Sequence, residues 1–253
     1  MDKLFNKDLY YIMIMDMDPD YNNCRYCKRM MLQASKFGNV GLVYYLLRNG
    51  VDPNFSDEYL RAPIHYAVDS NSPSIVKLLA EYGSEINIFD DDFEYPITKA
   101  IKSNNTYIAN ILIDAGADKT IFNDFDLLHE SINKKRREMT ELLIDNGTDV
   151  LMKDSEDHIP LHYAAYNDDI KGMLHVLNYV ASYSGYEVCE KMIYEILTHH
   201  EIYSDEVLSA IIDYFLSIKQ KDRNYFLRYS YNMIKTLIDD TDELTALYIN
   251  KKN

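Results

Sequence analysis

The chain is poor in the residues that build tight turns, cross-links and phosphate-binding loops. Its 253 residues include 8 Gly, 6 Pro, 3 Cys and no Trp. Few glycines leave little material for phosphate loops or flexible linkers. Three cysteines cannot form a disulfide framework in a chain of this length. Cys24 and Cys27 have zinc-like spacing, but no second ligand pair stands at a matching distance, so we interpret them as ordinary thiols.

Basic residues are also scarce. Lys and Arg total 26 against 41 Asp and Glu, so the formal net charge is −15. A field of that sign repels nucleic-acid phosphates and anionic membrane surfaces. The most hydrophobic stretch, residues 9–15, is far shorter than the roughly 20 residues that span a bilayer, and no basic region precedes it as in a secretory signal. The sequence therefore predicts an intracellular, cytoplasmic protein that binds neither nucleic acid nor membrane.

What the chain does contain is an internal repeat. Small residues recur at steps of 33, 33, 31 and 33 residues, at Ala34, Ala67, Ala100, Ser131 and Ala164. A second series keeps the same spacing, with steps of 33, 33 and 31 between Gly50, Gly83, Gly116 and Gly147. Because both series share one two-residue deletion, they identify a repeat of about 33 residues.

Each unit reads as a pair of helices. Pro63 and Pro96 open a first helix, where a missing N–H group costs nothing. A second helix carries apolar residues on one face, such as Ile75 and Leu79. A glycine such as Gly83 then ends it in a left-handed cap. One such pair cannot bury its apolar face alone, so the sequence predicts an all-α solenoid of stacked units.

These residues resemble the ankyrin repeat. The best local matches are residues 160–165, Pro-Leu-His-Tyr-Ala-Ala, and residues 112–118, Leu-Ile-Asp-Ala-Gly-Ala-Asp. The resemblance implies helix-turn-helix units whose extended stretches form hairpin fingers along one edge of a concave surface. The chain departs from the family pattern in three ways. Leu60, Phe93 and Asp157 replace the finger-turn glycine, the segment from Gly116 to Asp126 is two residues short, and Val180 replaces a terminal glycine.

The resemblance divides the chain into three parts. Residues 1–28 are expected to cap the N-terminal end, and residues 29–180 to form five ankyrin repeats. Residues 181–253 read as one or two degenerate helical repeats that also close the solenoid. Within them, Ser204 can cap one helix, and residues 227–238 carry the apolar spacing of another.

No pattern in the chain indicates catalysis. His65, His129 and His162 recur at one repeat position, so we expect structural hydrogen bonds inside each unit rather than a catalytic or metal site. Phosphate-binding loops, nucleophile elbows and paired zinc motifs are missing from the sequence. The chain is therefore predicted to be non-enzymatic, with no cofactor and no metal. The basic run Lys134–Arg137 is expected in the loop between two helices. We interpret it as a solvated loop, the alternatives being a nuclear-import signal or a contact with an acidic partner.

The fingers combine aromatic and acidic residues, which favours them as the protein-binding site. The candidates are Phe55, Asp57, Glu58, Tyr59, Phe89, Asp90, Asp91, Asp92, Phe93, Glu94, Phe122, Asp124, Phe125, Glu156, Asp157 and His158. Exposed aromatics beside acids would form binding hot spots for a partner with a basic and apolar surface. The alternative is that the aromatics pack between the fingers, and the concave and convex helical faces remain competing interfaces.

The composition and the repeat organisation of the chain resemble those of one group within the family. Its 23 Tyr residues, degenerate outer repeats and near-complete coverage by repeats resemble the ankyrin proteins of poxviruses. The end of the chain, residues 244–253, lacks the Leu-Pro-x-Glu-Ile start of an F-box segment, so the chain is most similar to the short host-range members without one. That resemblance implies a factor that binds and inhibits a host antiviral or NF-κB-pathway protein. The alternative is an adaptor that delivers a host protein to a ubiquitin ligase.

Overall fold

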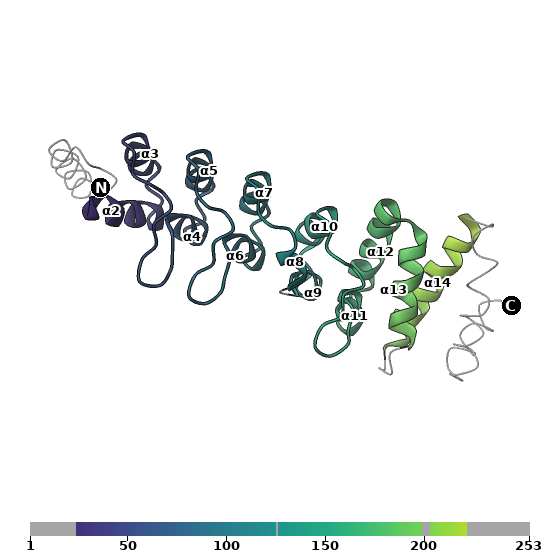
Figure 1. Ribbon diagram of the computed structural model, residues 1–253. Coiled ribbons are helices and arrows are strands. Elements are labelled where there is room, and N and C mark those ends of the chain that lie inside the picture. The colour runs from purple at the N-terminus through teal and green to yellow at the C-terminus, as the bar shows by residue number, and fades with distance from the viewer. Residues whose placement is uncertain (1–23, 125, 199–202, 222–253) are drawn as a thin grey trace. The chain divides into compact units, whose positions relative to one another are not determined.

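The computed structural model describes residues 24–124, 126–198 and 203–221 (Figure 1), and these contain thirteen helices and no strand. The expected all-α fold is therefore confirmed for the described part. Most of the predicted N-terminal cap and the predicted helix at residues 227–238 lie outside the described residues. Contacts divide the chain into two compact units, Met1–Lys119 and Thr120–Asn253, which are taken in turn.

The first unit consists of three helix pairs. These are α2 (Arg25–Lys36) with α3 (Val40–Arg48), α4 (Pro63–Asp69) with α5 (Pro73–Glu81), and α6 (Pro96–Lys102) with α7 (Thr106–Asp114). Helices α2, α4 and α6 form one row and α3, α5 and α7 another (Figure 1). Two long loops, before α4 and before α6, project beyond the row of α2, α4 and α6.

Local sequence explains these pairs. Pro63 and Pro96 are the first residues of α4 and α6, as predicted. Ala67 and Ala100 are fully buried, which lets neighbouring first helices approach closely, and Ile75 and Leu79 of α5 are equally buried. Gly83 follows α5 with a φ of 81°, a left-handed conformation that glycine adopts without steric cost.

The second unit begins with the short helix α8 (Ile121–Asp124) and continues with longer ones. These are α9 (Leu127–Asn133), α10 (Arg137–Asp145), α11 (Pro160–Tyr166), α12 (Ile170–Ser184), α13 (Tyr186–Thr198) and α14 (Asp205–Lys221). Helix α9 packs on α11 and α10 packs on α12, which repeats the two-row pattern of the first unit. Helix α12 also packs on α13 and α14.

Helix α12 is longer than the second helices of the earlier repeats, because Val180 stands where they have a terminal glycine. Helices α3, α5, α7 and α10 have nine residues each, whereas α12 has 15 and ends before Gly185, whose φ is 87°. The predicted boundary at residue 180 therefore falls inside α12. The boundary at residue 28 likewise falls inside α2, because Cys24 occupies its N-cap.

The prediction that Ser204 caps a helix is confirmed. Helix α14 begins at Asp205, and the N–H group of Val207 donates to Oγ of Ser204 at 3.3 Å. None of the described helices is long and apolar enough to span a membrane.

Candidate protein interface

Three loops carry the same tight turn, and an aspartate begins each one. Oδ1 of Asp57, Asp90 and Asp154 accepts hydrogen bonds from the N–H groups two and four residues later, at 2.9 to 3.1 Å. The residues three places after these aspartates, Leu60, Phe93 and Asp157, have φ values of 54°, 60° and 68°. The family's finger turn thus forms without its glycine, and the aspartate's hydrogen bonds offset the cost of a left-handed residue.

Asp90 is a structural residue of the second finger (residues 88–95). It is only 1% exposed. Besides the two backbone bonds, its Oδ2 lies 3.8 Å from Nε of Arg61 and 3.7 Å from Nζ of Lys99. The prediction that Asp90 contacts a partner is therefore wrong, because its carboxylate is buried and already engaged by backbone and cations.

Asp57 has the same role in the first finger (residues 55–61). Its Oδ2 accepts a hydrogen bond of 2.6 Å from the hydroxyl of Tyr66. Burial, together with this hydrogen bond, raises the pKa of Tyr66 to about 12. In the last finger (residues 153–158), the hydroxyl of Tyr163 donates to Oδ2 of Asp154 at 2.7 Å. The first aspartate of each finger thus ties the turn to the following helix.

A chain of ion pairs lies behind the first two fingers. Arg61 pairs with Asp69, and Nζ of Lys99 lies 3.4 Å from Asp69 and 3.6 Å from Glu94. Nζ of Lys102 donates to Glu94 at 2.8 Å. Glu94 was a predicted contact residue, but its charge is compensated by these two lysines, so it contributes less to the field that a partner would meet.

The tips of the first two fingers, by contrast, are exposed and lie together. The N–H group of Asp91 donates to the carbonyl oxygen of Tyr59 at 3.1 Å, which joins the two fingers. The rings of Phe89 and Phe93 stack with centroids 5.7 Å apart and are 41% and 69% exposed. Tyr59 is 53% exposed. The aromatics here therefore both pack on each other and face solvent.

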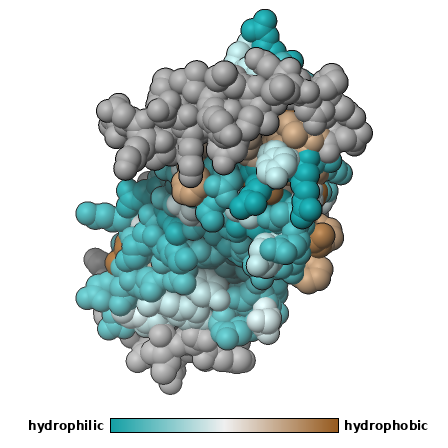
Figure 2. Space-filling view, turned by 90° about the vertical axis from the view of Figure 1, so that its left-hand side faces the viewer, coloured by the Kyte–Doolittle hydropathy of each residue, from teal (hydrophilic) through white to brown (hydrophobic). Residues whose placement is uncertain are grey.

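A groove of about 490 Å³ runs beside these tips. Tyr59, Asp91 and Asp92 line it at the fingers, and Lys36 and Ser70 line it at the ends of α2 and α4. The face in Figure 2 is mostly hydrophilic, with hydrophobic residues in small separate groups.

The other predicted site residues divide between exposed and buried positions. Glu58, Glu156 and Asp157 are exposed, and Phe55 is half-buried, with Nζ of Lys28 5.6 Å from its ring centre. Phe122 is fully buried in α8, so its prediction as a contact is wrong. His158 is also wrongly predicted, because it is buried and its Nε2 bonds the hydroxyl of Tyr166 at 2.9 Å. Asp124 ends α8 but its side chain, like all of Phe125, lies outside the described residues.

The structural role of the turn aspartates was not predicted, although their spacing in the sequence indicates it. Asp57, Asp90 and Asp154 stand 33 and 64 residues apart, which is one repeat and two repeats with the two-residue deletion. A residue that keeps the repeat spacing is more often structural than partner-specific, and this criterion separates Asp90 from its neighbours Asp91 and Asp92.

Two of the three repeated histidines behave as predicted. Nδ1 of His65 accepts from the N–H group of Ala62 at 3.1 Å, and Nδ1 of His162 accepts from that of Ile159 at 3.0 Å. His129 differs, because its Nε2 donates to the carbonyl oxygen of His158, outside its own helix pair. All three are buried and structural. Of the basic run, residues 134–136 lie between α9 and α10, and Arg137 is the first residue of α10. Lys134 and Arg136 pair with Glu130.

One group of potential metal ligands occurs among the described residues. It is Asp90, Asp91 and Asp92, whose carboxylate oxygens lie within 4.8 Å of one another. The oxygens of Asp90 already accept two N–H groups and face two cations. This cluster is explained by the turn and needs no ion.

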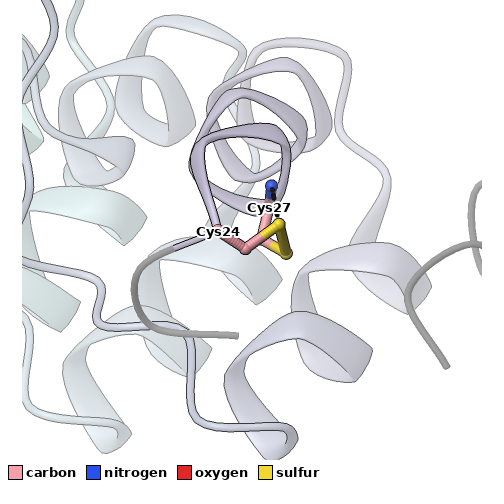
Figure 3. Close-up of a disulfide and its surroundings, with 2 residues drawn as sticks. All are labelled: Cys24 and Cys27. Carbon is pink, nitrogen blue, oxygen red and sulfur yellow. Dashed lines mark hydrogen bonds between the residues drawn. A yellow bond between two sulfur atoms is a disulfide. The ribbon is translucent and has the colours of Figure 1, made fainter. Parts of the chain in front are cut away.

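The two N-terminal cysteines are not the ordinary thiols that the sequence suggested. Cys24 and Cys27 are joined by a disulfide, with Cα atoms 5.2 Å apart, at the start of α2 (Figure 3). The spacing of three residues at a helix start brings the two sulfur atoms together, whatever the number of cysteines elsewhere. Cys189 is free and buried.

Comparison with known proteins supports the repeat assignment. The model for ankyrin repeats in three copies matches residues 9–90, 30–123 and 97–192, which together cover more than half of the chain. No curated protein matches the chain. Ankyrin repeats mediate binding to protein partners and are generally non-enzymatic scaffolds. Together with the paired helices and finger turns, this match shows that the chain belongs to the ankyrin-repeat family.

Proposed function

We propose that the chain binds a protein partner through the tips of its first two fingers. This binding edge comprises Glu58, Tyr59, Phe89, Asp91, Asp92 and Phe93. The observation that carries the proposal is the exposed Phe89–Phe93 stack next to exposed acids, on two fingers joined by a hydrogen bond. A preformed aromatic pair loses little conformational freedom on binding, which is the property of an interface hot spot.

The partner is proposed to present a basic and apolar surface. Asp91 and Asp92 are exposed at the edge, whereas Asp90 and Glu94 are compensated from within. The net charge of −15 gives the whole chain a field of the same sign. Such a field accelerates the approach of a basic partner and repels acidic ones.

The proposed biological role is that of a non-enzymatic, cytoplasmic host-range factor of a poxvirus. In this role the binding edge would occupy and inhibit a host antiviral or NF-κB-pathway protein. The support comes from the tyrosine-rich composition and the degenerate outer repeats.

The alternative role is that of an adaptor for a ubiquitin ligase, in which the helices after Val180 would recruit the ligase. The observation that favours it is that α13 and α14 pack on α12 and on each other after the fifth predicted repeat. These helices would offer a surface separate in sequence from the binding edge.

Affinity capture from transfected host cells tests both roles. The wild-type chain is compared with a variant in which Phe89, Asp91, Asp92 and Phe93 are all replaced by Ser. We expect a host protein that is captured by the wild type and lost from the variant, while circular dichroism stays unchanged. Capture that is equal for both chains would contradict the binding edge. Cullin subunits in the capture, with loss of the target that a proteasome inhibitor reverses, would favour the adaptor over the inhibitor.

A further inference from the structure

The Cys24–Cys27 disulfide occupies an unusual place in the chain. Cys24 is the N-cap of the twelve-residue helix α2, and Cys27 lies in its first turn. The N–H group of Cys27 donates to Sγ of Cys24 at 3.2 Å, and Figure 3 shows the two sulfur atoms side by side at the helix start. The sulfur of Cys24 thus takes the position that the oxygen of a Ser or Asp cap normally occupies.

The two sulfur atoms differ in their access to solvent. Cys27 is only 1% exposed and belongs to the buried face of α2, whereas Cys24 is half-buried. A reagent from solvent therefore reaches the disulfide at Cys24. When a thiolate attacks the sulfur of Cys24, Cys27 is the leaving group. Its sulfur stays next to Cys24 and can attack the mixed disulfide there to form the Cys24–Cys27 bond again.

The surroundings of Cys24 favour a negatively charged sulfur. The first turn of α2 has no acidic residue, and three of the five residues after Cys24 are basic, namely Arg25, Lys28 and Arg29. The positive end of the helix dipole and the N–H group of Cys27 act in the same direction. Helix starts and neighbouring cations are the two environments that most often turn a cysteine into a reactive thiolate.

We propose that Cys24 and Cys27 form a reversible thiol–disulfide exchange site, in which Cys24 is the attacking and attacked sulfur and Cys27 the resolving one. Its co-reactant is a low-molecular-weight thiol such as glutathione, together with the corresponding disulfide. The site is independent of the binding edge, which lies on the first two fingers.

The exchange is balanced in two steps. A small-molecule thiolate attacks Sγ of Cys24, breaks the Cys24–Cys27 bond and forms a mixed disulfide on Cys24, and Cys27 leaves as a thiolate that takes up a proton. A second thiolate then attacks the small molecule's sulfur, releases Cys24 as a thiolate and forms the small-molecule disulfide. Two thiols are oxidised and the two cysteines are reduced, and the reverse steps restore the bond.

Cys189 provides an internal control in the same chain. It is completely buried in α13, and its Sγ donates to the carbonyl oxygen of Leu177 at 3.2 Å. Burial raises the pKa of this thiol to about 12. Cys189 is therefore expected to stay protonated and unreactive under conditions in which Cys24 exchanges.

A redox titration of the full chain tests the proposal first. The protein is equilibrated with glutathione and glutathione disulfide in varying ratio, quenched in acid, unfolded and alkylated, and its free thiols are counted by mass spectrometry. We expect a reversible change from three free thiols to one, with Cys189 the thiol that remains. Three free thiols at every ratio, including excess glutathione disulfide, would overturn the proposal.

Two variants then test the roles of the sulfur atoms. In Cys27→Ala, we expect glutathione disulfide to leave a stable mixed disulfide on Cys24, because no resolving thiol is present. In Cys24→Ser, which keeps a helix-capping side chain, Cys27 should stay unmodified. Circular dichroism checks that both variants fold. Modification of Cys27 but not of Cys24 would contradict the assignment.

The pH dependence of alkylation tests the thiolate directly. In the reduced wild type, the rate at which iodoacetamide modifies Cys24 should reach its half-maximum below pH 8.5, the ordinary cysteine pKa of about 8.5 being the reference. At pH 7, Cys24 should react at least about 100-fold faster than Cys189. A half-maximum at or above pH 8.5 would show that the helix start does not activate Cys24 and would overturn its role as the attacking sulfur.

Discussion

Phe89 and Phe122 stand 33 residues apart, at the same position of successive repeats, yet they have opposite surroundings. Phe89 is 41% exposed at the tip of the second finger, whereas Phe122 is fully buried in α8. The segment between Gly116 and Asp126 is two residues short, and the chain there forms a helical turn in place of a finger. Repeat position alone therefore does not determine exposure, because loop length decides whether an aromatic side chain projects or packs.

The largest expected loss of stability is that of Phe122→Ala, and Phe89→Ala is its matched control. Phe122→Ala removes a fully buried ring and should lower the free energy of unfolding by about 3–5 kcal/mol. Phe89→Ala removes a half-exposed ring and one stacking contact, which should cost at most about 1 kcal/mol. Urea denaturation followed by circular dichroism measures both. Equal losses would mean that the two positions are equivalent after all.

A second comparison is between two adjacent aspartates of the second finger, the buried Asp90 and the exposed Asp91. Asp90→Ala should lower the free energy of unfolding by about 2–3 kcal/mol, because it removes two backbone hydrogen bonds and one of the two carboxylates that Arg61 and Lys99 share, the other being Asp69. Asp91→Ala, the matched control one residue away on the exposed side, should change it by less than about 0.5 kcal/mol. A similar loss for both variants would exclude a special role for Asp90.

Restoring the family's glycine tests what the finger turn costs. Leu60 and Phe93 both have positive φ values and exposed side chains. A left-handed residue costs about 1–2 kcal/mol, part of which glycine loses again as backbone entropy of about 0.5–1 kcal/mol. Leu60→Gly should stabilise the chain by about 0.5–1 kcal/mol in thermal denaturation. In Phe93→Gly this gain is offset by the loss of the stack with Phe89, so the stability should change by less than about 0.5 kcal/mol. Destabilisation by Leu60→Gly would show that the turn is not strained.

The smallest effect concerns the start of the first helices, where His65 and Thr98 occupy one repeat position. Burial lowers the pKa of His65, so the unfolded chain binds more protons and stability falls as the pH drops below about 6.5. Oγ1 of Thr98 accepts the corresponding hydrogen bond from the N–H group of Tyr95 at 3.0 Å, and the Thr98 hydroxyl does not titrate in this range. His65→Thr should therefore reduce the stability lost between pH 7 and pH 5, by less than about 1 kcal/mol. An unchanged slope in denaturation curves across this range would contradict the prediction.

Much of the fold follows from the sequence. The series of glycines from Gly50 to Gly147 predicts the repeat length and the ends of the second helices. Ser204 caps α14, as its position predicts. The candidate site was predicted less well, because aromatic and acidic composition does not reveal which side of a turn a residue occupies. Asp90 and Asp91 are identical in type and adjacent, and only the closed turn separates the buried carboxylate from the exposed one. The disulfide was missed because the spacing of Cys24 and Cys27 was interpreted only as half of a zinc motif, and the low cysteine count was taken to exclude cross-links.

The most direct measurement is calorimetric titration of the purified partner, once captured, against single-residue variants. Phe93→Ala at the tip of the second finger should raise the dissociation constant at least about tenfold. Tyr107→Ala serves as the control, because Tyr107 is equally large and 65% exposed but lies on α7, in the other row of helices from the fingers. Its dissociation constant should change less than about twofold. Strong weakening by Tyr107→Ala with none by Phe93→Ala would place the interface on the helical face and contradict the finger-tip interface.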